Sequence, residues 1–193
     1  MTVFKLSDIK RKPAADKKSE SKSEKFVEIH ITKVESLKQL VQCFPATGVI
    51  FFLWTLNSFN AFTFIPFVFN VSGTIDELVI CTYSINRRII DSLIRFVDKG
   101  KILQVTIFIS DSIKYRLPLV YDHLDALTKN RDNIRVNYAW NHSKIALAKS
   151  ADNYFVFEGS GNFSENAQYE QYVLLNSKEV YEFRRNCIAH FES

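Results

Sequence analysis

The sequence predicts an α/β fold in which a mixed, largely parallel β-sheet is layered with helices. Three observations support this prediction. Beyond residue 70, strand-like and helix-like segments alternate; the length of 193 residues suits one domain of ordinary size; and the apolar content of 47%, with 17 Phe, is enough to build a buried core. An order of strand, helix, strand, helix, strand is typical of layered α/β domains.

The first strand and helix of this order lie between residues 77 and 100. Residues 77–85, ELVICTYSI, are rich in apolar and β-branched side chains and predict a strand. Residues 86–100 predict a helix that ends at Gly100, because glycine favours the C-terminal cap. The apolar side chains at helical spacing in this segment are Ile89, Ile90, Leu93, Ile94 and Val97.

Three further segments continue the alternation. Residues 102–110, ILQVTIFIS, predict a strand, and residues 116–130 predict a helix with Pro118 in its first turn. Residues 134–140, IRVNYAW, alternate as a strand. The sequence shows no internal repeat, so any twofold symmetry must come from a second chain.

The charges divide the chain into an N-terminal arm and a domain. Residues 1–25 hold eight Lys or Arg and four Asp or Glu, which accounts for the whole net charge of +4. Their low hydrophobicity predicts a disordered basic arm, and residues 26–193 are predicted to form the domain. The arm either adds nonspecific attraction to nucleic acid or acidic lipid, or serves as a solubilising tail.

The cysteines and the longest uncharged stretch bear on location and membrane contact. Cys43, Cys81 and Cys187 are widely spaced and form no CxxC pair, which favours neither a disulfide framework nor a zinc cluster and indicates a reducing, cytoplasmic setting. We expect no metal and no cofactor. No charged residue lies between Lys38 and Asp76, but polar residues and a proline interrupt this stretch. Buried strands and a loop therefore fit it better than a membrane span.

The segment NHSKIALAKSADNYFVFEGSGNFSEN predicts a β-hairpin with polar groups on both arms. Residues 142–148 and 154–160 are typical of its strands, and residues 149–153 are typical of its turn. In a strand, the side chains at positions i and i+2 share one face. We therefore expect His142 and Lys144 to project together.

The returning strand is expected to bring Ser160 and Asn162 toward His142 and Lys144. A neutral imidazole can attack phosphorus, and an ammonium, a hydroxyl and an amide can hold the non-bridging oxygens that carry charge in the transition state. This set suits phosphodiester chemistry and needs no metal in principle. Each half of the pattern also occurs without function, as a chance pair or an ordinary turn.

These residues resemble the signature of the phospholipase D superfamily of phosphodiesterases and nucleases. That signature reads H-x-K, four residues, D, six residues, then G-S-x-N. Here seven residues separate Lys144 from Asp152, and Lys149 stands where the signature places the aspartate. A hairpin lengthened by three residues would explain the difference. The matching residues are His142, Lys144, Asp152, Gly159, Ser160 and Asn162.

The resemblance covers about residues 71–175 and implies a phospholipase D-like half-site domain. It implies structural roles for Asp152 and Gly159. In this family, a carboxylate after the G-S-x-N turn often orients the histidine. Glu170 has a similar position, Glu165 is the competing choice, and a solvated charge is the simpler interpretation of Glu170.

Active sites of this family use two such motifs, and this chain has one. One histidine attacks to give a phosphohistidine, and the other protonates the leaving oxygen. His30, His123 and His190 have no lysine two residues further on. The resemblance therefore implies a homodimer in which each chain supplies one His142 and one Lys144, with a bell-shaped pH dependence.

Three functions are compatible with these features. The first is a metal-independent phosphodiesterase, an endonuclease that cleaves DNA or RNA through a phosphohistidine intermediate in a homodimeric active site. The alternative is a catalytically inactive phospholipase D-like module that binds nucleic acid or a protein partner. The third is a phospholipase at a membrane, which the Phe-rich stretch favours and the lack of a second motif disfavours.

Other residues are candidates for substrate contact. Arg87 and Arg88, at the start of the predicted helix, either touch substrate or face solvent. Polar residues inside the uncharged stretch need hydrogen-bond partners, which suggests that some of them line a pocket. The candidates there are Trp54, Asn57, Ser58 and Asn60.

Overall fold

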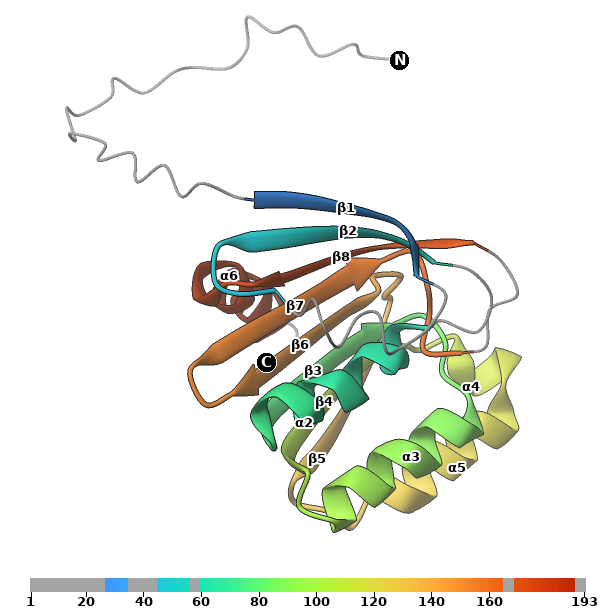
Figure 1. Cartoon of the computed structure of the whole chain (residues 1–193). Helices are drawn as coiled ribbons and strands as arrows, with labels where there is room; N and C mark the ends of the chain where they lie inside the picture. The colour runs from blue at the N-terminus through green and yellow to red at the C-terminus, as the bar shows by residue number, and fades with distance from the viewer. Residues whose placement is uncertain (1–26, 35–44, 56–59, 165–168, 190–193) are drawn as a thin grey trace, which may run out of the picture.

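The structure is a computed structural model that describes residues 27–34, 45–55, 60–164 and 169–189 (Figure 1). The predicted arm, residues 1–25, lies outside the described residues. The elements in chain order are β1 (Val27–Val34), β2 (Val49–Thr55), η2 (Ala61–Phe64), α2 (Ile65–Ser72), β3 (Ile75–Thr82), α3 (Arg87–Asp98), β4 (Ile102–Ser110), α4 (Ile113–Arg116), α5 (Pro118–Thr128), β5 (Ile134–Ala139), β6 (Ile145–Ser150), β7 (Asn153–Gly159), β8 (Glu170–Asn176) and α6 (Lys178–Ala189).

The strands of the described residues form one eight-stranded sheet in the order β1-β2-β8-β7-β6-β3-β4-β5 (Figure 1). β3, β4 and β5 are parallel neighbours joined by α3 and by α4 with α5, as the alternation of segments predicts. β6 runs antiparallel beside β3 and leads into the antiparallel strands β7 and β8. β2 pairs antiparallel with β8 and parallel with β1. The predicted mixed sheet layered with helices is confirmed.

Helices cover both faces of this sheet. On one face, α2, α3 and α5 pack over the larger apolar core, and α3 buries the side that its apolar spacing predicts. On the other face, α6 packs onto Val79, Leu147 and Val156 through Tyr181 and Ile188. Parallel strands end at the same edge of a sheet, so the segments that follow β3, β4 and β5 meet there. The candidate site lies at this edge.

The described part of the uncharged stretch contains the strand β2 and the helical segments η2 and α2. The sequence predicts buried strands and a loop here; β2 is a strand, although only one of its faces is buried, and the two helical segments are not predicted. Asn60 begins η2 with its side-chain oxygen accepting from the backbone of Thr63, and Pro66 occupies the first turn of α2, where proline favours a helix. No helix within the described ranges is long and apolar enough to cross a membrane.

The hairpin turn is tighter than the sequence predicts. β6 and β7 are joined by Ala151 and Asp152 alone, with Ala151 at a φ of +50°. The additional residues between Lys144 and Asp152 therefore lie in the paired strands and do not lengthen the turn. β6 begins at Ile145, so His142 precedes the strand instead of belonging to it.

Packing of Phe64 gives a test of the larger core. Its ring is fully buried, with centroids 5.2 Å from Phe157 and 5.0 Å from Tyr172. We expect Phe64→Ala to lower the free energy of unfolding by about 3–5 kcal/mol, because it leaves a cavity between these rings. Phe183→Ala, at a ring 60% exposed on α6, should cost less than about 1 kcal/mol. Urea denaturation measures both, and equal small losses would contradict this packing.

Candidate active site

The side chain of Asn141 joins the ends of two parallel strands to the segment that precedes β6. Its amide nitrogen donates to the carbonyl oxygens of Thr82, at 3.3 Å, and Phe108, at 3.2 Å. Its oxygen accepts from the backbone nitrogen of Ser143, at 2.9 Å, and from the Ser143 hydroxyl, at 2.6 Å. The amide thereby uses both of its donors and its acceptor. The backbone on either side of His142 is held against β3 and β4.

His142 and Lys144 lie together, as the sequence predicts. The ammonium nitrogen of Lys144 is 3.2 Å from Nδ1 of His142 and donates to the His142 carbonyl oxygen at 2.8 Å. A charged ammonium can only donate, so in this arrangement the proton of a neutral imidazole lies on Nε2. His142 is exposed, which leaves its ring accessible to a ligand.

Burial and a carboxylate act on the charge of Lys144 in opposite directions. Partial burial lowers the pKa of the Lys144 ammonium below its ordinary value, and the negative charge of Glu170 counteracts this lowering. Glu170 also accepts a hydrogen bond from the hydroxyl of Ser160. The predicted residues Lys144, Ser160 and Glu170 therefore belong to one electrostatic group.

Ser160 extends the pairing of β7 with β8 beyond the end of β7. Its backbone nitrogen donates to the carbonyl oxygen of Gln171 at 3.0 Å, and its hydroxyl oxygen accepts from the backbone nitrogen of Gln171 at 3.0 Å. The hydroxyl proton is directed to Glu170. Ser160 thus fixes the carboxylate of Glu170 at the start of β8.

The side chain of Asn162 lies next to Thr82, a fully buried residue at the end of β3. The Thr82 hydroxyl lies 3.5 Å from the side-chain oxygen of Asn162 and accepts from the backbone nitrogen of Phe163 at 3.2 Å. The Thr82 carbonyl oxygen is one of the two that Asn141 binds. Both ends of the predicted hairpin therefore converge on Thr82.

Gly159 and Asp152, the predicted structural residues, lie at opposite ends of β7. A Cβ at Gly159 would overlap the carbonyl oxygen of Gln171 and the ring of Tyr172, so β8 approaches β7 too closely for any side chain. Asp152 is exposed in the turn at the far end of β6 from His142. The structure does not bring Asp152 to the other motif residues.

Tyr83 and Arg116 join this group although the sequence analysis does not identify them. The ring centroid of Tyr83 is 4.7 Å from that of His142, and the Arg116 guanidinium lies 4.0 Å from the Tyr83 centroid. Arg116 also donates to the Tyr83 carbonyl oxygen at 3.3 Å and to the Ser112 hydroxyl at 3.1 Å. No motif spacing indicates either residue, because both reach His142 only through tertiary contacts.

Two hollows border the segment that carries His142 and Lys144. The first, which we name the His142 pocket, has a volume of 320 Å³. The second, the Lys144 groove, has a volume of 660 Å³ and runs across β2, β8, β7 and β6. The pocket is lined by Tyr83, Ser110, Ser112, Trp140, Asn141 and His142. Apolar side chains that line the groove include Phe52, Trp54, Ile145 and Val173.

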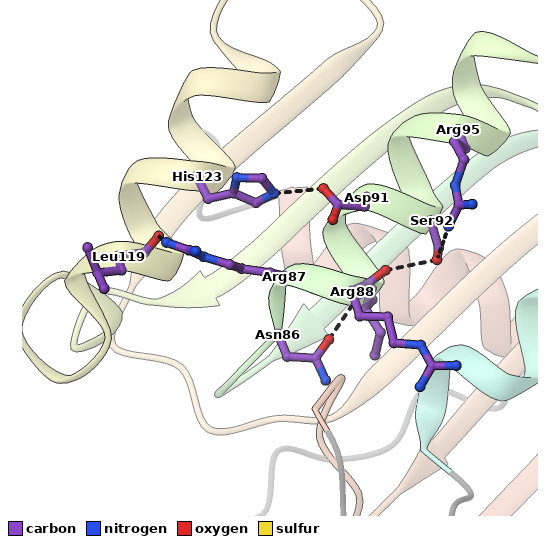
Figure 2. A network of polar contacts seen from close by, with 9 residues as sticks. Asn86, Arg87, Arg88, Asp91, Ser92, Arg95, Leu119 and His123 are labelled. Carbon is purple, nitrogen blue, oxygen red and sulfur yellow. Dashed lines mark hydrogen bonds and ion pairs between the residues drawn. The ribbon is translucent and has the colours of Figure 1, made fainter.

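Arg87, at the start of α3, contacts the neighbouring helix α5. Figure 2 shows Arg87 reaching from α3 to α5, where it donates to the carbonyl oxygen of Leu119 at 3.0 Å. His123 of α5 is 2.7 Å from Asp91 of α3, so the two contacts pin the helices together. Arg88 points away from this contact in the same view. Arg87 therefore supports helix packing.

The other predicted pocket residues have separate outcomes. Trp54 lines the Lys144 groove, whereas Asn60 caps η2. Asn57, Ser58 and Glu165 lie outside the described residues. Within the part of the chain that the structure describes, no three His, Cys, Asp or Glu side chains are grouped to hold a metal ion.

Comparisons with known proteins find similarity in structure alone. No family model and no curated protein matches the sequence. The chain is similar to polyphosphate kinase from Porphyromonas gingivalis, with 14% identity, a TM-score of 0.56, and coverage of 82% of this chain and 27% of that one. It is also similar to phosphatidylserine synthase from Haemophilus influenzae Rd KW20, with 12% identity, a TM-score of 0.49, and coverage of 74% and 38%. A third similar structure is that of TrmBL2, an archaeal chromatin protein, with 11% identity, a TM-score of 0.47, and coverage of 74% of this chain and 51% of that one.

The similarity to the polyphosphate kinase establishes the fold: this chain has a phospholipase D-like fold. The chain spans between 27% and 51% of the length of the three proteins.

The close approach at Gly159 gives a second stability test. We expect Gly159→Ala to lower the free energy of unfolding by about 3 kcal/mol, the upper end of the usual cost of overpacking, because the methyl group overlaps a backbone oxygen. Gly100→Ala is the control: Gly100 has a φ of +64° but open space around it, so only the backbone strain of about 1–2 kcal/mol is expected. Equal losses in the two variants would show that β8 does not crowd Gly159.

The opposing effects on Lys144 give a test of its charge. Glu170→Gln removes the negative charge that raises the pKa of Lys144, so the pKa should fall further and the ammonium should lose its proton at lower pH. A pH titration of the Lys144 side-chain NMR signals measures this shift. Glu182→Gln, which removes a carboxylate paired with Lys178 on α6, should leave the Lys144 titration unchanged. A pKa that rises or stays constant in Glu170→Gln would contradict the assigned role of Glu170.

Proposed function

We propose that this chain is one half of a metal-independent phosphodiesterase, an endonuclease that cleaves DNA or RNA as a homodimer. The observation that carries the proposal is the pair of His142 and Lys144, which Asn141 holds at the ends of β3 and β4 with the imidazole open to ligands. The fold, shared with part of a polyphosphate kinase, supports a reaction at phosphorus.

His142 supplies the nucleophile of the proposed reaction. A bound phosphodiester competes with Nδ1 for the ammonium of Lys144, because an anionic oxygen is the stronger acceptor. Once Lys144 moves to the phosphate, the neutral ring can carry its proton on Nδ1 and direct the lone pair of Nε2 at phosphorus. Attack forms the N–P bond and breaks the P–O bond to the leaving group. Lys144 stabilises the charge on the non-bridging oxygens, with Arg116 as a second cation nearby.

A second copy of the chain supplies the proton that the leaving oxygen needs. One imidazole cannot attack phosphorus and act as the acid in the same step. In a twofold dimer, His142 of the partner subunit protonates the leaving oxygen and then takes a proton from water. The water oxygen replaces the nitrogen on phosphorus, which releases the phosphate product and restores the free imidazole.

The Lys144 groove supports a position for this second copy. Phe52 is 38% exposed, Trp54 is 50% exposed, and the Trp54 ring stacks on Tyr169 with centroids 6.0 Å apart. Exposed apolar surface of this kind marks an interaction site. Because Lys144 lines the same groove, a copy that covers it lies next to the half-site.

Positive charge supports nucleic acid as the substrate. Lys144 lies beside the exposed imidazole, and Arg116 stacks on Tyr83, which contacts the same imidazole. Residues 1–25 carry the whole net charge of +4. Contacts between such cations and successive phosphates release counterions, so binding should weaken steeply as salt increases.

The proposal is tested by cleavage in excess EDTA. The protein is expected to nick plasmid DNA and to hydrolyse bis(4-nitrophenyl) phosphate. His142→Asn should lower both rates by at least about 1,000-fold, because asparagine cannot form the covalent intermediate or exchange the proton. Gel electrophoresis and the absorbance of nitrophenolate follow the two reactions.

His123→Asn is the matched control, because His123 pins α5 to α3 and should leave the rate unchanged (Figure 2). Cleavage by both wild type and His142→Asn, or by neither, would contradict the catalytic proposal. Salt-sensitive DNA binding without cleavage would favour the inactive nucleic-acid-binding module instead. Light scattering that finds only a monomer would exclude the shared site.

A further inference from the structure

The His142 pocket is a site that the phosphodiester chemistry leaves unused. Its volume of 320 Å³ falls at the lower end of the range for small-molecule pockets, about 300–1,000 Å³. Tyr83 follows β3, Ser110 ends β4, and Trp140 follows β5. These three parallel strands end at one edge, so their side chains form a single hollow beside the imidazole.

Two aromatic rings line the pocket. Trp140 is 94% exposed, which makes it the most exposed of the large apolar side chains that the structure describes. The ring of Tyr83 contacts His142 at 4.7 Å and is held by the guanidinium of Arg116 at 4.0 Å. An indole exposed to this degree beside a candidate nucleophile presents a flat apolar surface to whatever binds there.

Hydroxyl groups supply the polar part of the lining. The hydroxyl oxygens of Ser110 and Ser112 are 2.8 Å apart, and Ser110 is only 3% exposed. The Ser112 oxygen also accepts from Arg116. Each hydroxyl can donate once and accept twice, so this pair retains hydrogen-bonding capacity for the edge of a ligand.

We infer that the His142 pocket takes one nucleobase of a single-stranded nucleic acid whose phosphate lies at His142. The inference rests on the proposed function and narrows its substrate. The exposed face of Trp140 suits stacking on a base, and the hydroxyl pair suits its polar edge. An acyl chain has neither a flat face nor such an edge. A base in a duplex is stacked and paired, so it enters the pocket only from a single strand or after it is unpaired.

Fluorescence tests the contact directly. The chain has two tryptophans, so Trp54→Phe leaves Trp140 as the only indole. Combining Trp54→Phe with His142→Asn should prevent cleavage of the oligonucleotide during the measurement. Titration with oligothymidylate should quench the Trp140 emission, whereas an abasic oligonucleotide of the same length should leave it nearly unchanged.

Affinity provides the second readout. Trp140→Ala should weaken oligothymidylate binding about ten-fold, which is the loss expected for one stacked base, and should not change abasic oligonucleotide binding. Phe183→Ala removes another exposed ring, on α6, and should change neither affinity.

The inference would be overturned by equal quenching by the two oligonucleotides, by equal losses of affinity for them in Trp140→Ala, or by a shift of Trp140 emission with phosphatidylglycerol vesicles and none with oligothymidylate. Dissociation of a dimer by Trp140→Ala, seen by light scattering, would assign the residue to the interface and also overturn it. Base-dependent quenching in a protein that cleaves nothing would defeat the catalytic proposal and still support the base pocket.

Discussion

Asn141 bonds the ends of β3 and β4 to the short segment that carries His142 and Lys144. This segment lies between β5 and β6 and outside the strands, and its backbone is positioned by that amide and by the hydrogen bond from the Gly159 backbone nitrogen to the Lys144 carbonyl oxygen. The amide satisfies two strand carbonyls and a backbone N–H together, and its removal would leave these groups without their partners. The orientation of His142 toward Tyr83, the reach of Lys144 and the shape of the His142 pocket all depend on this contact.

Partial burial and neighbouring charges set the balance of charge at the site. Lys144 is partly buried, which lowers its pKa, while Glu170 favours the charged form and is itself held by Ser160. Arg116 stacks on the ring of Tyr83, and Tyr83 contacts His142. Two cations and one carboxylate leave an excess of positive charge, which suits a phosphodiester anion next to the imidazole.

The alternation of segments predicts most of the fold, because the burial of α3 and the strands β3 to β5 follows local apolar spacing. The i, i+2 rule predicts that His142 and Lys144 lie together, but both residues precede β6, and the contacts of the Lys144 ammonium with His142 bring them together instead. The rest depends on tertiary contacts. The bonds of Asn141 hold His142 outside β6, and the two-residue turn leaves Asp152 far from it, although their spacing in the sequence suggests one motif. Tyr83 and Arg116 come from segments distant in sequence, so no local pattern identifies them.

The proposed sharing of one site by two chains can be measured in mixed dimers. Wild type and His142→Asn chains are unfolded, mixed in varying proportion and refolded together, and phosphodiester cleavage is measured against the wild-type fraction. If both imidazoles of a dimer are needed, the rate follows the square of that fraction, and an equal mixture retains roughly a quarter of the activity. A rate that falls linearly, to roughly half in the equal mixture, would show that each chain acts alone and would contradict the shared site.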